Sequence, residues 1–293
     1  MACFRKWMAV LLAACWIAPA SADFNSLQAE LRETLQQAGD QGIRVSVGVS
    51  ALEGGSAGAT LLMGDALSYA PASTIKMLLV ASLMQQVDAG LLTLQQTTTV
   101  SPADVVGGYG VLQEEAQPQD VTLGRLAELT VTISDNTATN VLVDVVGYPA
   151  MAGLAAQLGL ELMHFGRKMF EAPEPPAKDN YINAPDALAL LTAIYSGTLL
   201  SDDSRDQIMR WLSAQTVRTK IAAGVPDGVK VAHKTGENGP VSHDIGFIML
   251  PDSTLAVAIF TENLKGSDFD ASQALLNPLV AEITSTIYRH LGR

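Results

Sequence analysis

The chain has 293 residues, of which 48% are hydrophobic and 16% are charged, and its formal net charge is −12 at pH 7. The apolar content is enough for one sizeable core or two lobes, which excludes an intrinsically disordered chain. The acidic charge argues against nucleic acid as a partner, and no apolar run beyond residue 22 is long enough to cross a bilayer.

The first residues are typical of a secretory signal peptide. Arg5 and Lys6 precede an apolar run over 7–18, and the small-residue Ala-x-Ala site that follows predicts cleavage after Ala22. The mature protein would then be secreted or periplasmic. The string that ends at Cys15 also resembles a lipoprotein cleavage box, so a lipid anchor at Cys15 is the alternative. Both cysteines of the chain lie in this segment, so the mature chain would contain no disulfide.

The first half of the mature chain begins with a helix and two strands. Residues 24–39 repeat apolar positions at helical spacing, whereas 43–50 alternate as a strand does, and 59–63 could pair with them. A helix over 75–87 is apolar on most sides and is therefore expected to be buried. Further helices are expected at 123–132, 138–146, 149–158, 185–196 and 203–214.

The second half returns to strands after a loop. The polar passage 165–185 contains three prolines between 173 and 176, which indicates a surface loop. Strand composition follows at 229–234, 245–249 and 255–260, and a final helix is expected over 272–291.

This order of elements predicts a single α/β (α+β) domain of two lobes. An antiparallel sheet built from the N- and C-terminal segments, about 23–66 and 215–293, would be flanked by helices. An all-helical lobe would span about 67–214. A site is expected in the cleft between the lobes.

Three short motifs follow one another along this plan. Ser73 and Lys76 form a Ser-x-x-Lys string at the start of the buried helix. Ser134, Asp135 and Asn136 stand between two helices, and Lys234, Thr235 and Gly236 end a strand. Each motif alone is weak, because a serine before an apolar run is usually a helix N-cap. Their order and their placement on the expected elements make coincidence a poor explanation.

The spacing of the first motif suits nucleophilic catalysis. Residues i and i+3 at a helix start lie on one face, so Lys76 would lie beside Ser73. A serine hydroxyl needs a base to take its proton. A buried lysine close to another cation, such as Lys234, has a lowered pKa and can act as that base.

The chain resembles the penicillin-recognising serine enzymes, and most closely the class A β-lactamases, which carry Ser-x-x-Lys, Ser-Asp-Asn and Lys-Thr-Gly. The likeness extends over "PASTIKMLLVASLMQQVDAGLLTL", "LTVTISDNTATNVLVDVVG" and "VKVAHKTGENGPVSHDIGFIML". The resemblance implies a β-lactamase/transpeptidase-like fold and a serine β-lactamase that forms an acyl-Ser73 intermediate, with a role in antibiotic resistance.

The resemblance also implies roles for the other motif residues. Ser134 would pass a proton to the leaving nitrogen, and Asn136 would hold Lys76 and the substrate amide. Lys234 and Thr235 would meet the substrate carboxylate. Gly236 would leave room for the substrate along the strand, the N–H groups of Ser73 and Glu237 would form an oxyanion hole, and Tyr109 would line the rim.

The chain departs from this family in the loop that carries the deacylating glutamate. That glutamate stands two residues after an arginine in a Glu-x-x-Leu-Asn string, whereas Arg167 is followed by Lys168, Met169, Phe170 and only then Glu171. Glu171 is the candidate if the loop is rerouted, with a solvated loop carboxylate as the simpler interpretation.

The family's carboxylate-binding arginine is also missing from its expected strand, where His243 and Asp244 stand instead. Arg218 and Lys220 are possible substitutes.

The predicted function is therefore a class A-type β-lactamase, a hydrolase without metal or cofactor, acting as a monomer on a small-molecule substrate. Two alternatives stay open. One is a peptidase or esterase acting on D-alanyl peptides or simple esters. The other is a penicillin-binding sensor or trap that is acylated and deacylates slowly. The four histidines show no metal-binding spacing.

Overall fold

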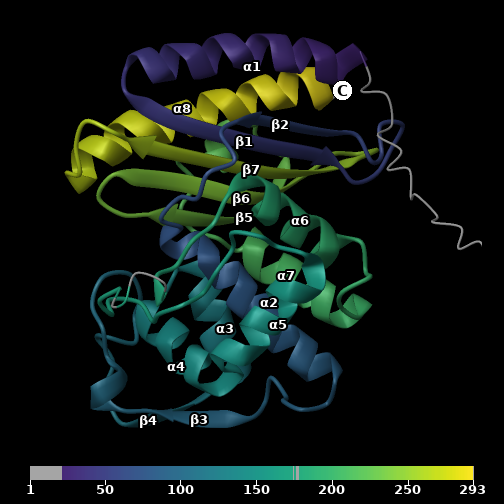
Figure 1. The fold of residues 1–293 in the computed structure, drawn as a ribbon. Helices are drawn as coiled ribbons and strands as arrows, with labels where there is room; N and C mark the ends of the chain where they lie inside the picture. The colour runs from purple at the N-terminus through teal and green to yellow at the C-terminus, as the bar shows by residue number, and fades with distance from the viewer. Residues whose placement is uncertain (1–21, 174, 176–177, 293) are drawn as a thin grey trace, which may run out of the picture.

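The computed structural model describes residues 22–173, 175 and 178–292, so the expected signal peptide, with Cys15, lies outside the described residues. Its centre is a five-stranded antiparallel sheet in which the first and last parts of the chain lie side by side (Figure 1). The strand order is β2-β1-β7-β6-β5. The strands are β1 (Ile43–Ala51), β2 (Thr60–Gly64), β5 (Lys230–Glu237), β6 (Val241–Met249) and β7 (Thr254–Asn263).

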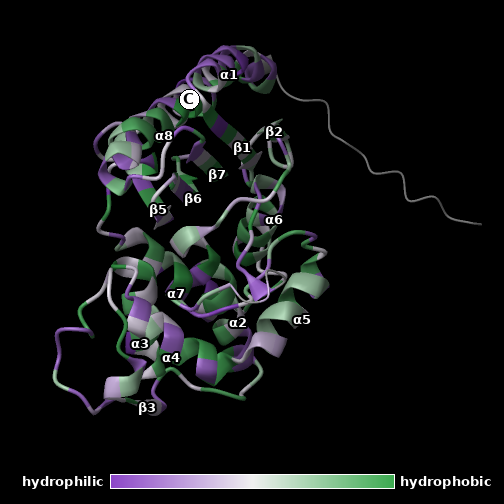
Figure 2. Cartoon of the chain, turned by 60° about the vertical axis from the view of Figure 1, so that its left-hand side comes forward, coloured by the Kyte–Doolittle hydropathy of each residue, from purple (hydrophilic) through white to green (hydrophobic). Residues whose placement is uncertain are grey.

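Two helices cover one face of this sheet. They are α1 (Ala22–Asp40) and α8 (Phe269–Leu291), which contact each other and the sheet. Leu27 and Leu31 of α1 pack with Ile283 of α8 and with sheet residues in one buried cluster. Figure 2 shows α1 largely in the hydrophilic colour, as expected of an outer cover with an apolar stripe.

The helical lobe lies on the other side of the sheet (Figure 1). Its centre is α2 (Lys76–Asp88), in which nine of 13 residues are buried, and α2 contacts α3, α4, α5 and α7. The surrounding helices are α3 (Leu123–Thr132), α4 (Asn136–Val146), α5 (Tyr148–Leu158), α6 (Ala184–Tyr195) and α7 (Asp202–Ser213). Among the described residues no single helix is long and apolar enough to cross a membrane; α4 and α5 reach that length only as a pair bent by 82°.

The predicted α+β class is confirmed, and the expected helices and strands are present within a few residues of their predicted ends. A two-stranded ribbon was not predicted; it pairs β3 (Thr97–Val100) with β4 (Gln119–Thr122). Short 3-10 turns were also not predicted: η1 (Ala72–Ile75), η2 (Pro102–Asp104) and η4 (Ile221–Ala223). Of these, η1 matters most for the site, because it separates Ser73 from the α-helix expected to begin there.

Candidate active site

Ser73 lies in η1, immediately before α2. Thr74 fixes this turn by donating its N–H and its hydroxyl to the carbonyl of Pro71, at 3.1 and 2.7 Å. Ala72 has a φ of 46°, a left-handed conformation that costs a non-glycine residue about 1–3 kcal/mol and clusters at functional sites. The N-cap positions are Pro71 and Ile75, so Ser73 is not the helix cap that its sequence context would ordinarily indicate.

Lys76 is fully buried at the first position of α2. Side chains three apart are eclipsed in a 3-10 turn, so η1 places Ser73 and Lys76 on one side of the chain. The Lys76 Nζ donates to the Ser134 carbonyl (2.7 Å), to the Ser134 Oγ (3.2 Å) and to the Asn136 Oδ1 (2.8 Å). Burial, and then the charge of Lys234, lowers the pKa of Lys76 well below its ordinary value. This arrangement suits a lysine that accepts a proton.

The Ser-Asp-Asn motif forms a buried turn between α3 and α4. Ser134 has a φ of 61°, and its Oγ accepts hydrogen bonds from Lys76 (3.2 Å) and from Lys234 (3.0 Å). The Asn136 Nδ2 donates to the Gly107 carbonyl at 3.1 Å, so Asn136 connects Lys76 to the 105–118 loop. The three motifs thus meet at the Ser134 hydroxyl.

Asp135 holds this turn in place. One carboxylate oxygen caps α4 by accepting the N–H of Ala138 at 2.8 Å. The other accepts the N–H groups of Val111 (2.8 Å) and Leu112 (3.0 Å). Asp135 therefore fixes the start of α4 and the loop that carries Tyr109 to one point.

Lys234 is fully buried on β5 and donates to the Thr235 carbonyl at 2.9 Å. Burial lowers the pKa of Lys234 to about 7; the charge of Lys220 also lowers it, whereas the carboxylates of Asp244 and Glu237 oppose the shift. Its ammonium group is therefore lost as the pH rises through the neutral range.

Gly236 is needed for the packing of β5 against η1. A Cβ at this position would lie 2.8 Å from the Pro71 carbonyl oxygen and 2.9–3.0 Å from atoms of Thr74. The residue therefore faces η1, and the absence of a side chain lets β5 approach the turn that carries Ser73. The expectation that Gly236 also leaves room for the substrate along the strand stays a prediction.

Glu237 connects two walls of the site. Its Oε2 accepts the Tyr109 hydroxyl at 2.6 Å, and its Oε1 accepts the Lys220 Nζ in an ion pair. Lys220 is fully buried, whereas Arg218 is exposed. Of the two cations considered as substitutes for the family's arginine, the structure brings Lys220 to the site.

His243 and Asp244, where that arginine was expected, belong to the interior of the sheet. His243 packs against Tyr69 and Phe260, and burial lowers its pKa to about 3. The Asp244 Oδ2 accepts the N–H of Ile221 at 3.0 Å and lies 2.9 Å from the His233 Nδ1. Asp244 thus anchors the segment that begins just after Lys220.

Glu171 is not brought to the site. Its side chain is exposed, and its Oε2 accepts the N–H of Lys168 at 3.0 Å, so the carboxylate turns back onto its own loop. The cleft is lined instead by Arg167, Met169 and Phe170 of this loop, and Met169 stands two positions after Arg167. An Arg167–Asp179 ion pair (2.6 Å) braces this loop.

Asn140 fixes the backbone of Met169 and was not predicted from the sequence. Its Oδ1 accepts the Met169 N–H at 2.8 Å, and its Nδ2 donates to the Met169 carbonyl at 3.1 Å. Asn140 stands one helical turn after Asn136 on α4, and this i, i+4 spacing is the signal that could have found it.

The cleft that these residues line has a volume of about 340 Å³. Its walls come from η1, the 108–109 and 167–170 segments, Asp179, Asn180 and the end of β5. Ser73, Tyr109, Asn136 and Glu237 are among the lining residues. Ser73 and Glu237, whose N–H groups are the expected oxyanion donors, thus share one cleft. Within the described residues no group of His, Cys, Asp and Glu could hold a metal ion.

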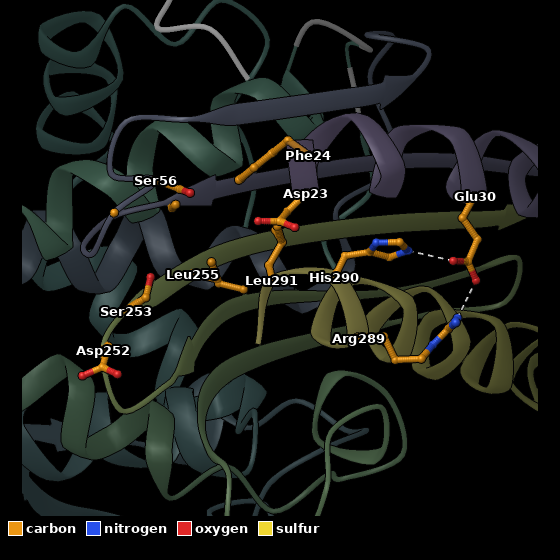
Figure 3. A pocket seen from close by; sticks show the side chains of 12 residues that line it. Asp23, Phe24, Glu30, Ser56, Asp252, Ser253, Leu255, Arg289, His290 and Leu291 are labelled. Carbon is orange, nitrogen blue, oxygen red and sulfur yellow. Dashed lines mark hydrogen bonds and ion pairs between the residues drawn. The ribbon is translucent and has the colours of Figure 1, made fainter. Parts of the chain in front are cut away.

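A separate cavity of about 520 Å³ contains none of the motif residues (Figure 3). It lies between the start of α1, the end of α8 and the β1–β2 and β6–β7 turns. Three of its titratable lining residues pair with one another: Glu30 accepts from Arg289 (2.6 Å) and lies 2.7 Å from the His290 Nε2 (Figure 3). The chemistry of the three motifs therefore points to the Ser73 cleft.

Comparisons with known proteins identify the family of the chain. Residues 26–291 match the model of the beta-lactamase enzyme family. Beta-lactamase AER-1 of Aeromonas hydrophila is 32% identical over 211 residues, which cover 69% of each chain. The chain belongs to the beta-lactamase enzyme family, which identifies it as a hydrolase.

Solved structures extend the likeness to nearly the whole chain. PBP-A superposes with a TM-score of 0.81 at 25% identity, over 92% of this chain and 97% of PBP-A. A leucine-to-glutamate mutant of PBP-A, solved as an acyl-enzyme complex with penicillin-G, has a TM-score of 0.80 at 26% identity, over 93% and 98% of the two chains.

The packing of Gly236 leads to a stability prediction. Gly236→Ala should lower the free energy of unfolding by about 2 kcal/mol, because the new methyl group overlaps the backbone of η1. The matched control is Gly153→Ala on the exposed side of α5, where an added Cβ meets nothing within 4 Å; it should gain about 0.5–1 kcal/mol. Urea unfolding of both variants measures the difference. A Gly236→Ala protein as stable as the wild type would contradict the packing argument.

Proposed function

We propose that the chain is a serine hydrolase that β-lactams acylate at Ser73 and that releases the acyl group slowly. The observation that carries the proposal is the position of Met169. It lines the same cleft as Ser73, and in the sequence it stands two residues after Arg167, the position that the deacylating glutamate has in the class A pattern. A thioether cannot take a proton from water, whereas a carboxylate can.

The acylation half of the reaction is supported by the buried lysines. Lys76, with its lowered pKa, takes the proton of the Ser73 hydroxyl as the oxygen attacks the lactam carbonyl. The C–N bond of the ring breaks, and Ser134, which accepts from Lys76 and Lys234, passes a proton to the leaving nitrogen. The N–H groups of Ser73 and Glu237 receive the developing oxyanion.

The deacylation half lacks an unpaired carboxylate in the described cleft. Two carboxylates line it: Asp179 is paired with Arg167, and Glu237 is paired with Lys220. Glu171 turns away, and Glu174 lies outside the described residues. Slow release follows, because general-base activation of water is typically worth about 10²–10⁴-fold in rate.

Two rival functions share the acyl-Ser73 step. An efficient class A β-lactamase, the type predicted from the motifs and named among the relatives, would hydrolyse the ester quickly and confer antibiotic resistance. A D-alanyl peptidase or esterase would transfer the acyl group of another substrate. Secretion directed by residues 1–22 and a monomeric state stay predictions.

Turnover and intact mass, followed together, separate these functions. The purified protein is mixed with a chromogenic cephalosporin, and absorbance and mass are recorded over time. The proposal predicts a burst of about one equivalent, a persistent adduct, and no adduct with Ser73→Ala. Many rapid turnovers favour the β-lactamase, and no adduct at all favours a different substrate. An adduct on Ser73→Ala would exclude Ser73 as the nucleophile.

Met169→Glu should accelerate release of the acyl group at least tenfold, because it places a carboxylate on a backbone that Asn140 already fixes. Met169→Gln, of similar size but without a base, should not accelerate it. Glu171→Gln should leave release unchanged, since that carboxylate binds its own loop. The decay of the adduct by mass spectrometry measures all three. Slower release in Glu171→Gln would return Glu171 to the mechanism.

The pKa of Lys234 leads to a pH prediction. Because that pKa is lowered to about 7, the ammonium is present below pH 7 and is lost above it. Acylation by a carboxylate-bearing penicillin should therefore fall as the pH rises through 7, by up to about tenfold per pH unit. Lys234→Arg keeps its charge and should flatten this fall. A wild-type rate that rises through the same range would contradict the assignment.

A further inference from the structure

The carboxylate of Glu237 closes the end of the cleft beside the motif residues. Tyr109 comes from the loop after η2, and Lys220 comes from the segment after α7. Glu237 receives a hydrogen bond from Tyr109 at 2.6 Å and an ion pair from Lys220. The side chains of Lys220 and Glu237 are 0% and 8% exposed. The Glu237 carboxylate is therefore largely desolvated, and it joins the wall that carries Tyr109 to the wall that carries Lys220.

The recess behind this bridge is almost full. It is lined by Ser73, Tyr109, Ser134, Val217, Thr235 and Glu237, and its volume is about 10 Å³. That is about the space of a single water molecule. A ligand carboxylate that is to reach Ser134 and Thr235 must therefore displace Glu237 or Tyr109.

The electrostatics of the bridge make this displacement costly. A fully buried ammonium such as that of Lys220 needs a counter-ion, and Glu237 supplies it. An incoming carboxylate can pair with Lys220 only if Glu237 leaves. If Glu237 stays, the incoming carboxylate meets its like charge at short range. A neutral ligand group does not compete for Lys220.

We propose that Glu237 is a specificity-determining residue, a built-in anion that selects against substrates with a carboxylate beside the scissile amide nitrogen and favours neutral esters or amides at that position. This proposal rests on the acylation of Ser73 proposed above and narrows its substrate class.

The test compares penicillin G with its methyl ester, which differ in this one charge. The rate constant for acylation of Ser73 is measured for each compound by intact mass. Glu237→Gln should raise the penicillin G rate at least tenfold and change the methyl ester rate by less than about threefold. The control is Glu33→Gln, which removes the same charge from the exposed surface of α1 and should change neither rate.

Tyr109→Phe provides a second variant in case Glu237→Gln does not fold. It removes one hydrogen bond to Glu237 and leaves the Lys220 pair intact. The ratio of the penicillin G rate to the methyl ester rate should therefore rise by a smaller factor, about threefold. An unchanged ratio in the folded variants, or an equal rise for both compounds, overturns the role of Glu237 while acylation of Ser73 stands. No acylation of Ser73 by either compound, in the wild type or the variants, overturns both proposals.

Discussion

The Ser134 hydroxyl oxygen accepts hydrogen bonds from two buried lysines, and the geometry of the cleft follows from this contact. Lys76 comes from α2 in the helical lobe, whereas Lys234 comes from β5 at the edge of the sheet. Two fully buried ammonium groups that share one hydroxyl cannot both keep their ordinary pKa. Burial and the charge of Lys234 favour the free-amine form of Lys76, and Ser73 lies three residues before Lys76, on η1.

Three other residues hold in place the segments that bring both lysines to the Ser134 hydroxyl. Gly236 lets β5 approach η1, Asp135 fixes the Ser134 turn and the Tyr109 loop, and Asp244 anchors the segment after Lys220. These residues act through backbone groups, so their loss would move the catalytic side chains rather than change the chemistry directly. The loop around Met169 is fixed in the same way by Asn140, which gives the cleft a rigid wall without a base on it.

The sequence was sufficient for the fold and for the residues of the three motifs. Periodicity located the helices and strands, because their apolar positions face large buried surfaces. It missed the β3–β4 ribbon, because Thr97–Val100 and Gln119–Thr122 are short, mostly polar, and far apart in the chain. The Lys220–Glu237 pair depends on the approach of two distant segments, which no local pattern encodes. Whether the Glu171 carboxylate enters the cleft depends on the direction in which one loop turns its side chains, which the sequence does not reveal.

A crystal structure of the wild-type protein after treatment with penicillin G tests the central claim most directly. The account predicts an ester bond at the Ser73 Oγ, its carbonyl oxygen between the N–H groups of Ser73 and Glu237, and Met169 unmoved beside it. The Glu237 carboxylate should have left Lys220. Continuous density to another side chain, or an ester at Ser73 with the Glu171 carboxylate turned in beside it, would contradict the account.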